Sequence, residues 1–159
     1  MMEINVIDDG NCMFRCVATF LNKDFTIADR FKNGRIKARK LDELENKKAQ
    51  SLRVIVVEYL KLHKNKYEND IKYNDFDLYS NLDERIEKMS SDNELAGLLE
   101  LKILSKILKI NFNIYVKREC LEVDNECSST YNLVATVGKR NNVCNLLLEN
   151  QHYNLIIWS

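Results

Sequence analysis

The sequence lacks proline altogether and contains no serine-rich stretch, so its composition marks no flexible linker between domains. We therefore expect residues 1–159 to form a single domain, which at this length can bury a proper core. An excess of charge of either sign is also absent, because 24 basic residues balance 24 acidic residues. Together with a hydrophobic content of 45%, this balance excludes a disordered tail and a broadly basic nucleic-acid binder.

Long apolar runs are missing as well. No segment approaches the 18 uncharged apolar residues that indicate a membrane-spanning helix. The first ten residues, MMEINVIDDG, contain neither the basic region nor the apolar region of a secretory signal. The sequence therefore predicts a soluble protein that does not contact a membrane.

The cysteines form an odd set without any CxxC pair, which fits neither a disulfide framework nor a thiolate zinc site. A reducing compartment such as the cytosol is therefore expected. The five cysteines lie at positions 12, 16, 120, 127 and 144.

Apolar residues recur with helical spacing through the first two thirds of the chain. The segment 67–80 has no sustained period and is expected to be a surface connection. Ser80 and Asp83 are the expected caps of a short helix that ends at residue 89. The predicted helices cover residues 13–21, 26–66 with a break near Gly34, the short segment up to 89, and 94–108.

Alternation of apolar and polar residues then replaces the helical period and predicts strands. The sequence thus predicts an α+β fold in which helices pack against a small, mainly antiparallel sheet. The predicted strands cover residues 4–7, 111–116, 131–137, 143–148 and 152–158.

The stretch DDGNCMFRCVA, residues 8–18, places Cys12 in the first turn of a predicted helix. Gly10 permits a tight turn, and Asn11 is a good cap. A free cysteine is only a few per cent thiolate at neutral pH, but a helix N-terminus and a neighbouring imidazolium lower its pKa. Cys12 is therefore either an activated nucleophile or a small buried apolar residue, and the second interpretation suits Cys16.

A thiol nucleophile needs a base, and the chain contains two histidines. His63 lies in KLHKNK, at the polar end of a long helix, where we expect it to be solvated. His152 begins the last predicted strand, and Asn154 follows on the same face of that strand, about 6.5–7 Å along the chain. Asn154 is thus placed to orient His152, although a polar residue that merely closes a hairpin would fit the same position.

Three segments resemble the ovarian tumour (OTU) family of deubiquitinating cysteine proteases. Residues 9–15, DGNCMFR, resemble its nucleophile motif, and residues 152–154, HYN, resemble its histidine motif. Residues 95–105, LAGLLELKILS, are similar to its middle block. The order and spacing of these segments hold from residue 3 to residue 158.

The resemblance implies a papain-like OTU fold with Cys12 as nucleophile, His152 as general base and then acid, and Asn154 as the residue that orients the ring. It also implies that Asp9 shapes the oxyanion loop, either by holding backbone donors or by contributing directly. Asp9 as a simple turn former fits equally well. The implied reaction hydrolyses the bond between the C-terminal glycine of ubiquitin and a lysine amine through an acyl thioester, without a metal or another cofactor.

The sequence departs from the family at two of these positions. Leu95 replaces a frequent Trp, which alters the wall of the nearby loops, and Cys16 replaces a common Ala. Glu100 lies in an apolar helix, so we expect it to be a structural hydrogen-bonding residue.

The basic stretch at residues 30–40 carries six positive charges and no negative one. It is expected to be a solvated face, because no nucleic-acid motif accompanies it.

The expected partner is ubiquitin or polyubiquitin, bound by a monomer. Two alternatives stay open at this stage: the same chemistry on a ubiquitin-like modifier or on a Gly-Gly site in a polyprotein, and a non-catalytic ubiquitin-binding module. The expected compartment is the cytosol, which would be the host cytosol for a viral or bacterial effector. Linkage preference depends on surfaces that these motifs do not report.

Overall fold

The computed structural model describes residues 1–22, 34–68, 81–91, 94–118 and 130–158. Within them, five strands form one sheet with the order β1-β5-β4-β2-β3. The strands are β1 (Met2–Ile4), β2 (Asn111–Arg118), β3 (Thr130–Val137), β4 (Val143–Glu149) and β5 (His152–Ile157).

The sheet is mixed, as a mainly antiparallel prediction allows. All neighbouring strands pair antiparallel except β2 and β4, which run parallel. The reason is the path of the chain: it reverses into β3 on one side of β2, reverses again, and returns as β4 on the other side. The predicted strand at 4–7 is wrong, because pairing with β5 ends at Ile4 and the chain then leaves the sheet.

The main helices are α1 (Cys12–Leu21), α3 (Gly34–Leu62), α5 (Leu82–Met89) and α6 (Leu98–Leu108), and residues 64–68 add a short helical segment after α3. The predicted start of the last helix at residue 94 is wrong, because Gly97 is its extended N-cap and its N–H donates to the carboxylate of Glu100 at 2.8 Å. Residues 26–33 of the long predicted helix and most of the 67–80 connection lie outside the described residues.

The cap of α5 also differs from its prediction. Asn81, not Asp83, is the N-cap, and its side-chain oxygen accepts a hydrogen bond from the N–H of Glu84 at 2.8 Å. Asp83 instead lies in the first turn of the helix, while Ser80 lies outside the described residues.

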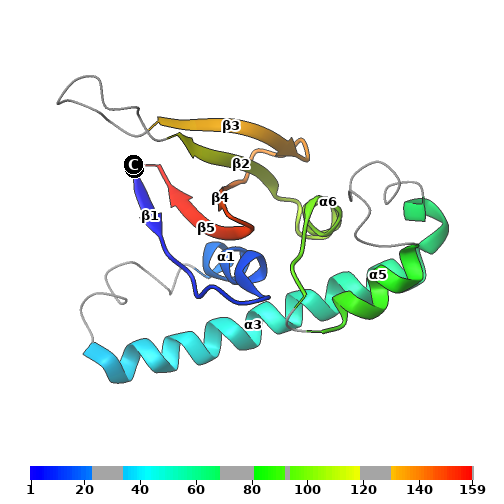
Figure 1. Cartoon of the computed structure of the whole chain (residues 1–159), viewed down its shortest axis with the longest axis horizontal. Coiled ribbons are helices and arrows are strands. Elements are labelled where there is room, and N and C mark those ends of the chain that lie inside the picture. The colour runs from blue at the N-terminus through cyan, green and yellow to red at the C-terminus, as the bar shows by residue number, and fades with distance from the viewer. Residues whose placement is uncertain (23–33, 69–80, 92–93, 119–129, 159) are drawn as a thin grey trace.

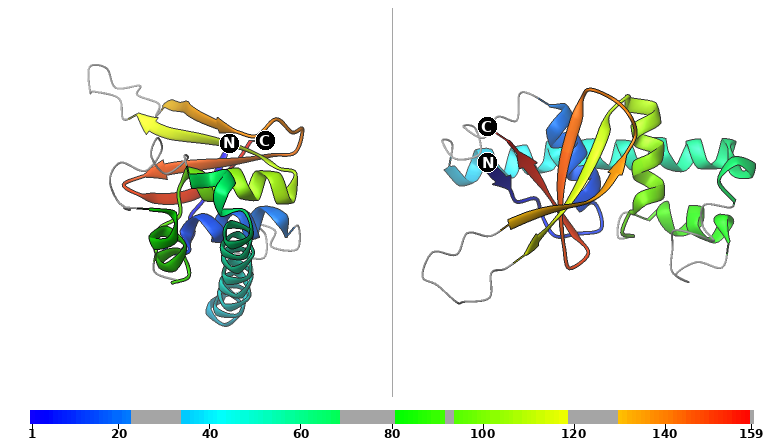
Figure 2. Two further views of the ribbon diagram at one scale, coloured as in Figure 1. Left: turned by 90° about the vertical axis from the view of Figure 1, so that its right-hand side faces the viewer. Right: turned by 90° about the horizontal axis from the view of Figure 1, so that it is seen from above.

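The described helices lie on one side of the sheet, with α1 between the sheet and the long helix α3 (Figures 1 and 2). The apolar face of α1, which includes Met13, Phe14 and Val17, is fully buried in the core. Leu146 of β4 and Leu155 of β5 belong to the same core. This packing fixes the N-terminal end of α1 beside the beginning of β5. No helix among the described residues is both long and apolar enough to cross a membrane.

Candidate active site

Cys12 begins α1 and is 2% exposed, so its sulfur is buried rather than displayed at the surface. Burial raises the pKa of this thiol, and backbone hydrogen bonds from Tyr153 and Met13 lower it by less. The carboxylates of Asp9 and Asp8 add to the increase. The expected lowering of the pKa by a helix N-terminus and an imidazolium is therefore not found, because burial and two nearby negative charges outweigh the backbone donors.

His152 and Asn154 lie on one face of β5, as alternation predicts, and their side chains are in contact. The ring nitrogen Nε2 of His152 lies 2.9 Å from Oδ1 of Asn154. The same oxygen accepts a hydrogen bond from the backbone N–H of Val6 at 3.1 Å, which identifies it as the acceptor. The amide nitrogen of Asn154 donates to Glu3 at 3.2 Å. The N-terminal segment thus fixes the side chain of Asn154. Nε2 of His152 carries the hydrogen that Oδ1 of Asn154 accepts.

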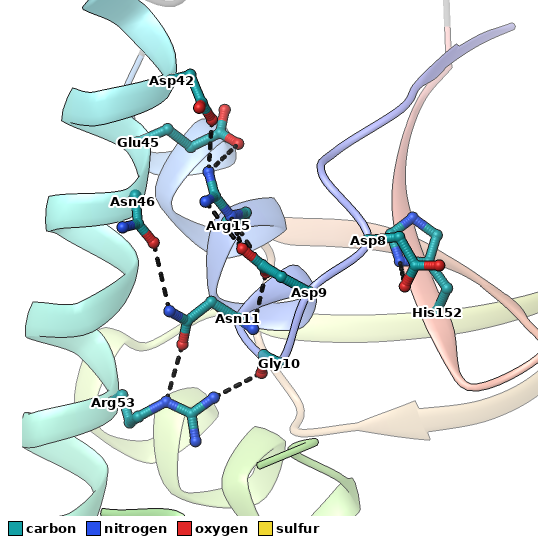
Figure 3. Close-up of polar contacts among 10 residues, drawn as sticks. All are labelled: Asp8, Asp9, Gly10, Asn11, Arg15, Asp42, Glu45, Asn46, Arg53 and His152. Atoms are coloured by element: carbon teal, nitrogen blue, oxygen red, sulfur yellow. Dashed lines mark hydrogen bonds and ion pairs between the residues drawn. The ribbon is translucent and has the colours of Figure 1, made fainter. Parts of the chain in front are cut away.

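The second ring nitrogen of His152 faces a carboxylate. Nδ1 is buried and lies 3.2 Å from Oδ1 of Asp8, without the geometry of a directed hydrogen bond. Figure 3 shows the two side chains facing each other. Among the described contacts, none is a hydrogen bond between His152 and the sulfur of Cys12, whose pKa is influenced by the backbone of Tyr153 and Met13. The structure therefore places Cys12 near the backbone of Tyr153, the neighbour of His152, and places Asp8 beside Nδ1.

Asp9 faces Asn11 of its own loop and Arg15 of α1 (Figure 3). Its carboxylate accepts a hydrogen bond from the N–H of Asn11 at 2.9 Å and pairs with the guanidinium of Arg15 at 2.9 Å. Arg15 is buried and also contacts Asp42 at 2.8 Å and Glu45 at 3.6 Å. In this geometry Asp9 holds a backbone N–H of the loop, which fits both a shaped oxyanion loop and a simple turn former.

Arg53 is a residue of the site that the sequence did not single out. Its side chain is 1% exposed and donates to the side-chain oxygen of Asn11 at 2.8 Å and to the carbonyl of Gly10 at 2.5 Å. It also donates to the carbonyls of Met89 at 3.2 Å and Glu94 at 2.8 Å. One guanidinium therefore joins the loop before Cys12 to the segment that leads into α6.

A signal for Arg53 was present in the sequence. The buried face of α3 includes Ala49, Leu52, Val56 and Leu60, and Arg53 lies one turn from two of these positions. A cation on an apolar stripe has to find polar partners in the interior. Which partners it finds depends on the tertiary fold.

Asn11 precedes α1 as expected, but it does not cap the helix with its side chain. Its oxygen accepts from Arg53, and its amide nitrogen donates to Asn46 of α3 at 3.3 Å. The side chain thus ties the loop to α3 instead of to the first turn of α1.

The other predicted residues lie where the sequence placed them. His63 is exposed and stacks on the ring of Tyr59, with ring centroids 4.1 Å apart. Glu100 is fully buried and forms an ion pair with Arg85 at 2.6 Å, which confirms its structural role. Cys16 is fully buried and donates to the carbonyl of Tyr153 at 3.4 Å.

Leu95 is 41% exposed and lies in the segment before α6. Of the cysteines, Cys12, Cys16 and Cys144 are described, and none of the three is in a disulfide. Cys120 and Cys127 lie outside the described residues, as do the side chains of the basic stretch at 30–40.

The family model for OTU-like cysteine proteases matches residues 7–153 of the chain. Among solved structures, the OTU domain of OTUD1 has a TM-score of 0.61 at 17% identity, covering 98% of this chain and 85% of that one. An OTU deubiquitinase from Wolbachia pipientis wMel bound to ubiquitin has a TM-score of 0.61 at 14% identity, with 98% and 94% covered. The Hazara virus OTU bound to ubiquitin has a TM-score of 0.59 at 19% identity, with 99% and 82% covered. No curated protein matches the chain by sequence.

Proposed function

Because the chain belongs to the family of OTU-like cysteine proteases, we propose that it is a deubiquitinase that hydrolyses isopeptide bonds between ubiquitin and lysine. The observation that carries the proposal is the contact of 2.9 Å between Nε2 of His152 and Oδ1 of Asn154, on the strand whose Tyr153 backbone also influences the pKa of the Cys12 thiol. A nucleophile, a base and a residue that fixes the tautomer of the base are the parts that thiol acyl transfer requires.

In the proposed reaction, Nδ1 of His152 accepts the proton of the Cys12 thiol, and the sulfur attacks the carbonyl of the terminal glycine. The imidazolium then gives this proton to the leaving lysine amine, and a thioester forms. His152 next removes a proton from water, which attacks the thioester and releases the carboxylate and the thiol. Asn154 holds Nε2–H throughout, so that Nδ1 stays available for each transfer.

The loop before Cys12 also supplies backbone donors for the negative charge that develops on the carbonyl oxygen. The N–H of Asn11 is taken by the carboxylate of Asp9. The N–H of Cys12 donates to the carbonyl of Asp9 at 3.2 Å, and we therefore assign the N–H of Gly10 to the oxyanion site. Arg53 holds the Gly10 carbonyl and thereby fixes the orientation of this part of the loop.

Ubiquitin is the proposed partner because the OTU proteins of similar fold from Wolbachia pipientis and Hazara virus were solved bound to ubiquitin. A ubiquitin-like modifier would use the same chemistry and is the second candidate substrate. A non-catalytic ubiquitin-binding role is less favoured, because the three groups that the chemistry needs are all present. Three unbridged thiols fit a reducing compartment, and we propose the cytosol.

The test uses ubiquitin that carries an electrophile in place of its C-terminal carboxylate. We expect one ubiquitin to be added, on Cys12 alone, because docking of ubiquitin concentrates the electrophile at one thiol. Cys16→Ala should still react, whereas Cys12→Ala and His152→Ala should not. Mapping of the adduct to another cysteine would contradict the assignment of the nucleophile. An adduct with a related modifier but not with ubiquitin would change the substrate and leave the mechanism standing.

A further inference from the structure

A cavity with a strongly basic lining lies between α6 and the turn that joins β3 to β4. It has a volume of about 430 Å³ and is lined by Lys102 and Lys106 from α6 and by Lys139 and Arg140 from the turn. Figures 1 and 2 show this turn beside α6. Within the described part of the chain, none of the residues that line the cavity is acidic. The cavity thus gathers four positive charges in a protein whose net charge is zero.

The turn is built to close on the helix. Gly138 has a φ of 93°, a left-handed conformation that favours glycine, and a Cβ at this position would lie 2.2 Å from the hydroxyl oxygen of Ser105. The backbone N–H of Asn111 donates to the carbonyl of Asn142 at 2.8 Å and holds the other end of the turn against β2. The two basic residues of the turn are therefore carried by a backbone that is held at both ends.

Ser105 adds a hydroxyl group to the lining of the cavity. This residue is 5% exposed, and its hydroxyl makes no hydrogen bond within the ranges that the structure describes. Buried hydroxyl groups ordinarily have a hydrogen-bond partner. An oxygen atom of a ligand in the cavity would provide one.

A further cation lies beside Lys106. Lys66 belongs to the short helical segment after α3, and the neighbouring ammonium group of Lys106 lowers the pKa of Lys66. Like charges at this distance repel each other, and an anion bound next to them reduces that repulsion. The cluster therefore favours a ligand that carries more than one negative charge.

The size and the lining of the cavity select among anions. A volume of about 430 Å³ exceeds that of a single phosphate group and lies in the range of sites for compact ligands. The described lining contains no aromatic ring on which a nucleic-acid base could stack. Ammonium and guanidinium groups, together with a hydroxyl, supply the many donors that phosphate oxygens accept.

We propose that this cavity is a binding site for a compact, soluble polyphosphate group, held by the four lining cations and the hydroxyl of Ser105. The site is separate from the candidate active site, because β4 begins next to the turn at Val143 and ends at Glu149, which pairs with His152. The two ends of a strand of this length are about 20 Å apart. Binding there does not depend on the proposed hydrolysis.

The test is calorimetric titration of the whole chain with inorganic tripolyphosphate at low ionic strength. We expect saturable binding of one ligand per chain that weakens as sodium chloride is added, because salt screens exposed cations. The double variant Lys139→Gln/Arg140→Gln should bind about tenfold more weakly, since it removes two charged donors. Ser105→Ala should bind about threefold more weakly without any change in charge. Thermal unfolding verifies that each variant is folded, and the double variant changes only exposed positions.

Lys117→Gln/Arg118→Gln is the matched control. It removes the same two types of side chain from exposed positions at the end of β2, whereas the turn lies next to the beginning of that strand. We expect its affinity for tripolyphosphate to equal that of the wild-type protein.

Equal losses of affinity in the two double variants would indicate a general attraction between charges and would overturn the site, as would the absence of saturable binding. Tighter binding of a short oligothymidylate than of tripolyphosphate would overturn it in favour of a nucleic-acid surface. Binding to vesicles that contain a phosphoinositide, without binding to tripolyphosphate, would assign the cavity to a lipid headgroup and overturn the soluble ligand.

Discussion

The guanidinium of Arg15 reaches the carboxylate of Asp9 at 2.9 Å from inside the protein, with 5% of the Arg15 side chain exposed. The arginine is one turn into α1, and the aspartate lies in the loop before that helix. Their contact closes the loop onto the helix that begins with Cys12. The same guanidinium contacts Asp42 and Glu45 of α3, so the loop is attached to a second helix as well.

Replacement of Arg15 should be more harmful than replacement of Asp9. Arg15→Ala removes the cation that three carboxylates share, and we expect the free energy of unfolding to fall by about 3–5 kcal/mol. Asp9→Ala leaves Arg15 its contacts with Asp42 and Glu45, and we expect a loss of about 1–3 kcal/mol. Urea denaturation of both variants measures the difference. Equal losses would show that the pairing with Asp9 dominates the cluster.

Asn154→Ala should lower kcat more than it raises KM, because it releases the ring of His152 without removing a contact to substrate. It should also destabilise the fold by about 1–3 kcal/mol, since Val6 and Glu3 lose a buried partner. Asn154→Asp keeps acceptors for His152 and Val6 but places a carboxylate beside Glu3. We expect it to retain part of kcat, measured with a fluorogenic ubiquitin conjugate. Wild-type kcat in Asn154→Ala would mean that another group orients the ring.

Cys12→Ala should abolish hydrolysis and leave ubiquitin binding nearly intact, because one sulfur atom is removed from a site that is otherwise unchanged. Cys16→Ala is the control, one turn along the same helix and fully buried. It should keep its activity and lose about 1 kcal/mol of stability with its hydrogen bond to Tyr153. Turnover assays measure the activity of both variants, and calorimetric titration measures the binding of ubiquitin to Cys12→Ala. An active Cys12→Ala together with an inactive Cys16→Ala would exchange the two roles.

Alkylation of Cys12 in the ligand-free protein should increase through the alkaline range. Burial raises the pKa of this thiol, so its thiolate fraction at neutral pH is below that of an ordinary cysteine, whose pKa is about 8.5. The midpoint of the rate against pH, measured by mass mapping of iodoacetamide adducts, should therefore lie above that value. The same shift affects stability: the folded state keeps this proton to higher pH than the unfolded state, so the contribution of Cys12 is fully present below the unfolded pKa and is lost as the pH rises through the raised folded pKa. A midpoint near neutrality would instead indicate an imidazolium beside the sulfur.

Local features of the sequence were enough to predict much of the fold, whereas the roles of the candidate residues came from the resemblance to the OTU family. Alternation placed His152 and Asn154 on one face of β5, and helical spacing found α1 and the core of α6. These predictions succeeded because a period of 2 or 3.6 residues is a property of the segment itself. Helix boundaries were predicted less accurately where the cap depends on one side chain. The side chain of Glu100 binds the N–H of Gly97 before α6, and the side chain of Asn81 caps α5.

What the sequence by itself determined is therefore local: a turn at Gly10 followed by a helix, a histidine two residues from an asparagine, and an α+β order of elements. The tertiary structure alone decided the contacts between distant segments. It placed Val6 against Asn154, 148 residues apart, and Arg53 against Gly10, 43 residues apart. It also turned Nδ1 of His152 toward Asp8 and buried the sulfur of Cys12. The physical reason is that periodicity reports which face of an element is buried, whereas the partner of that face, and with it the charges around a reactive group, is set by how the elements pack.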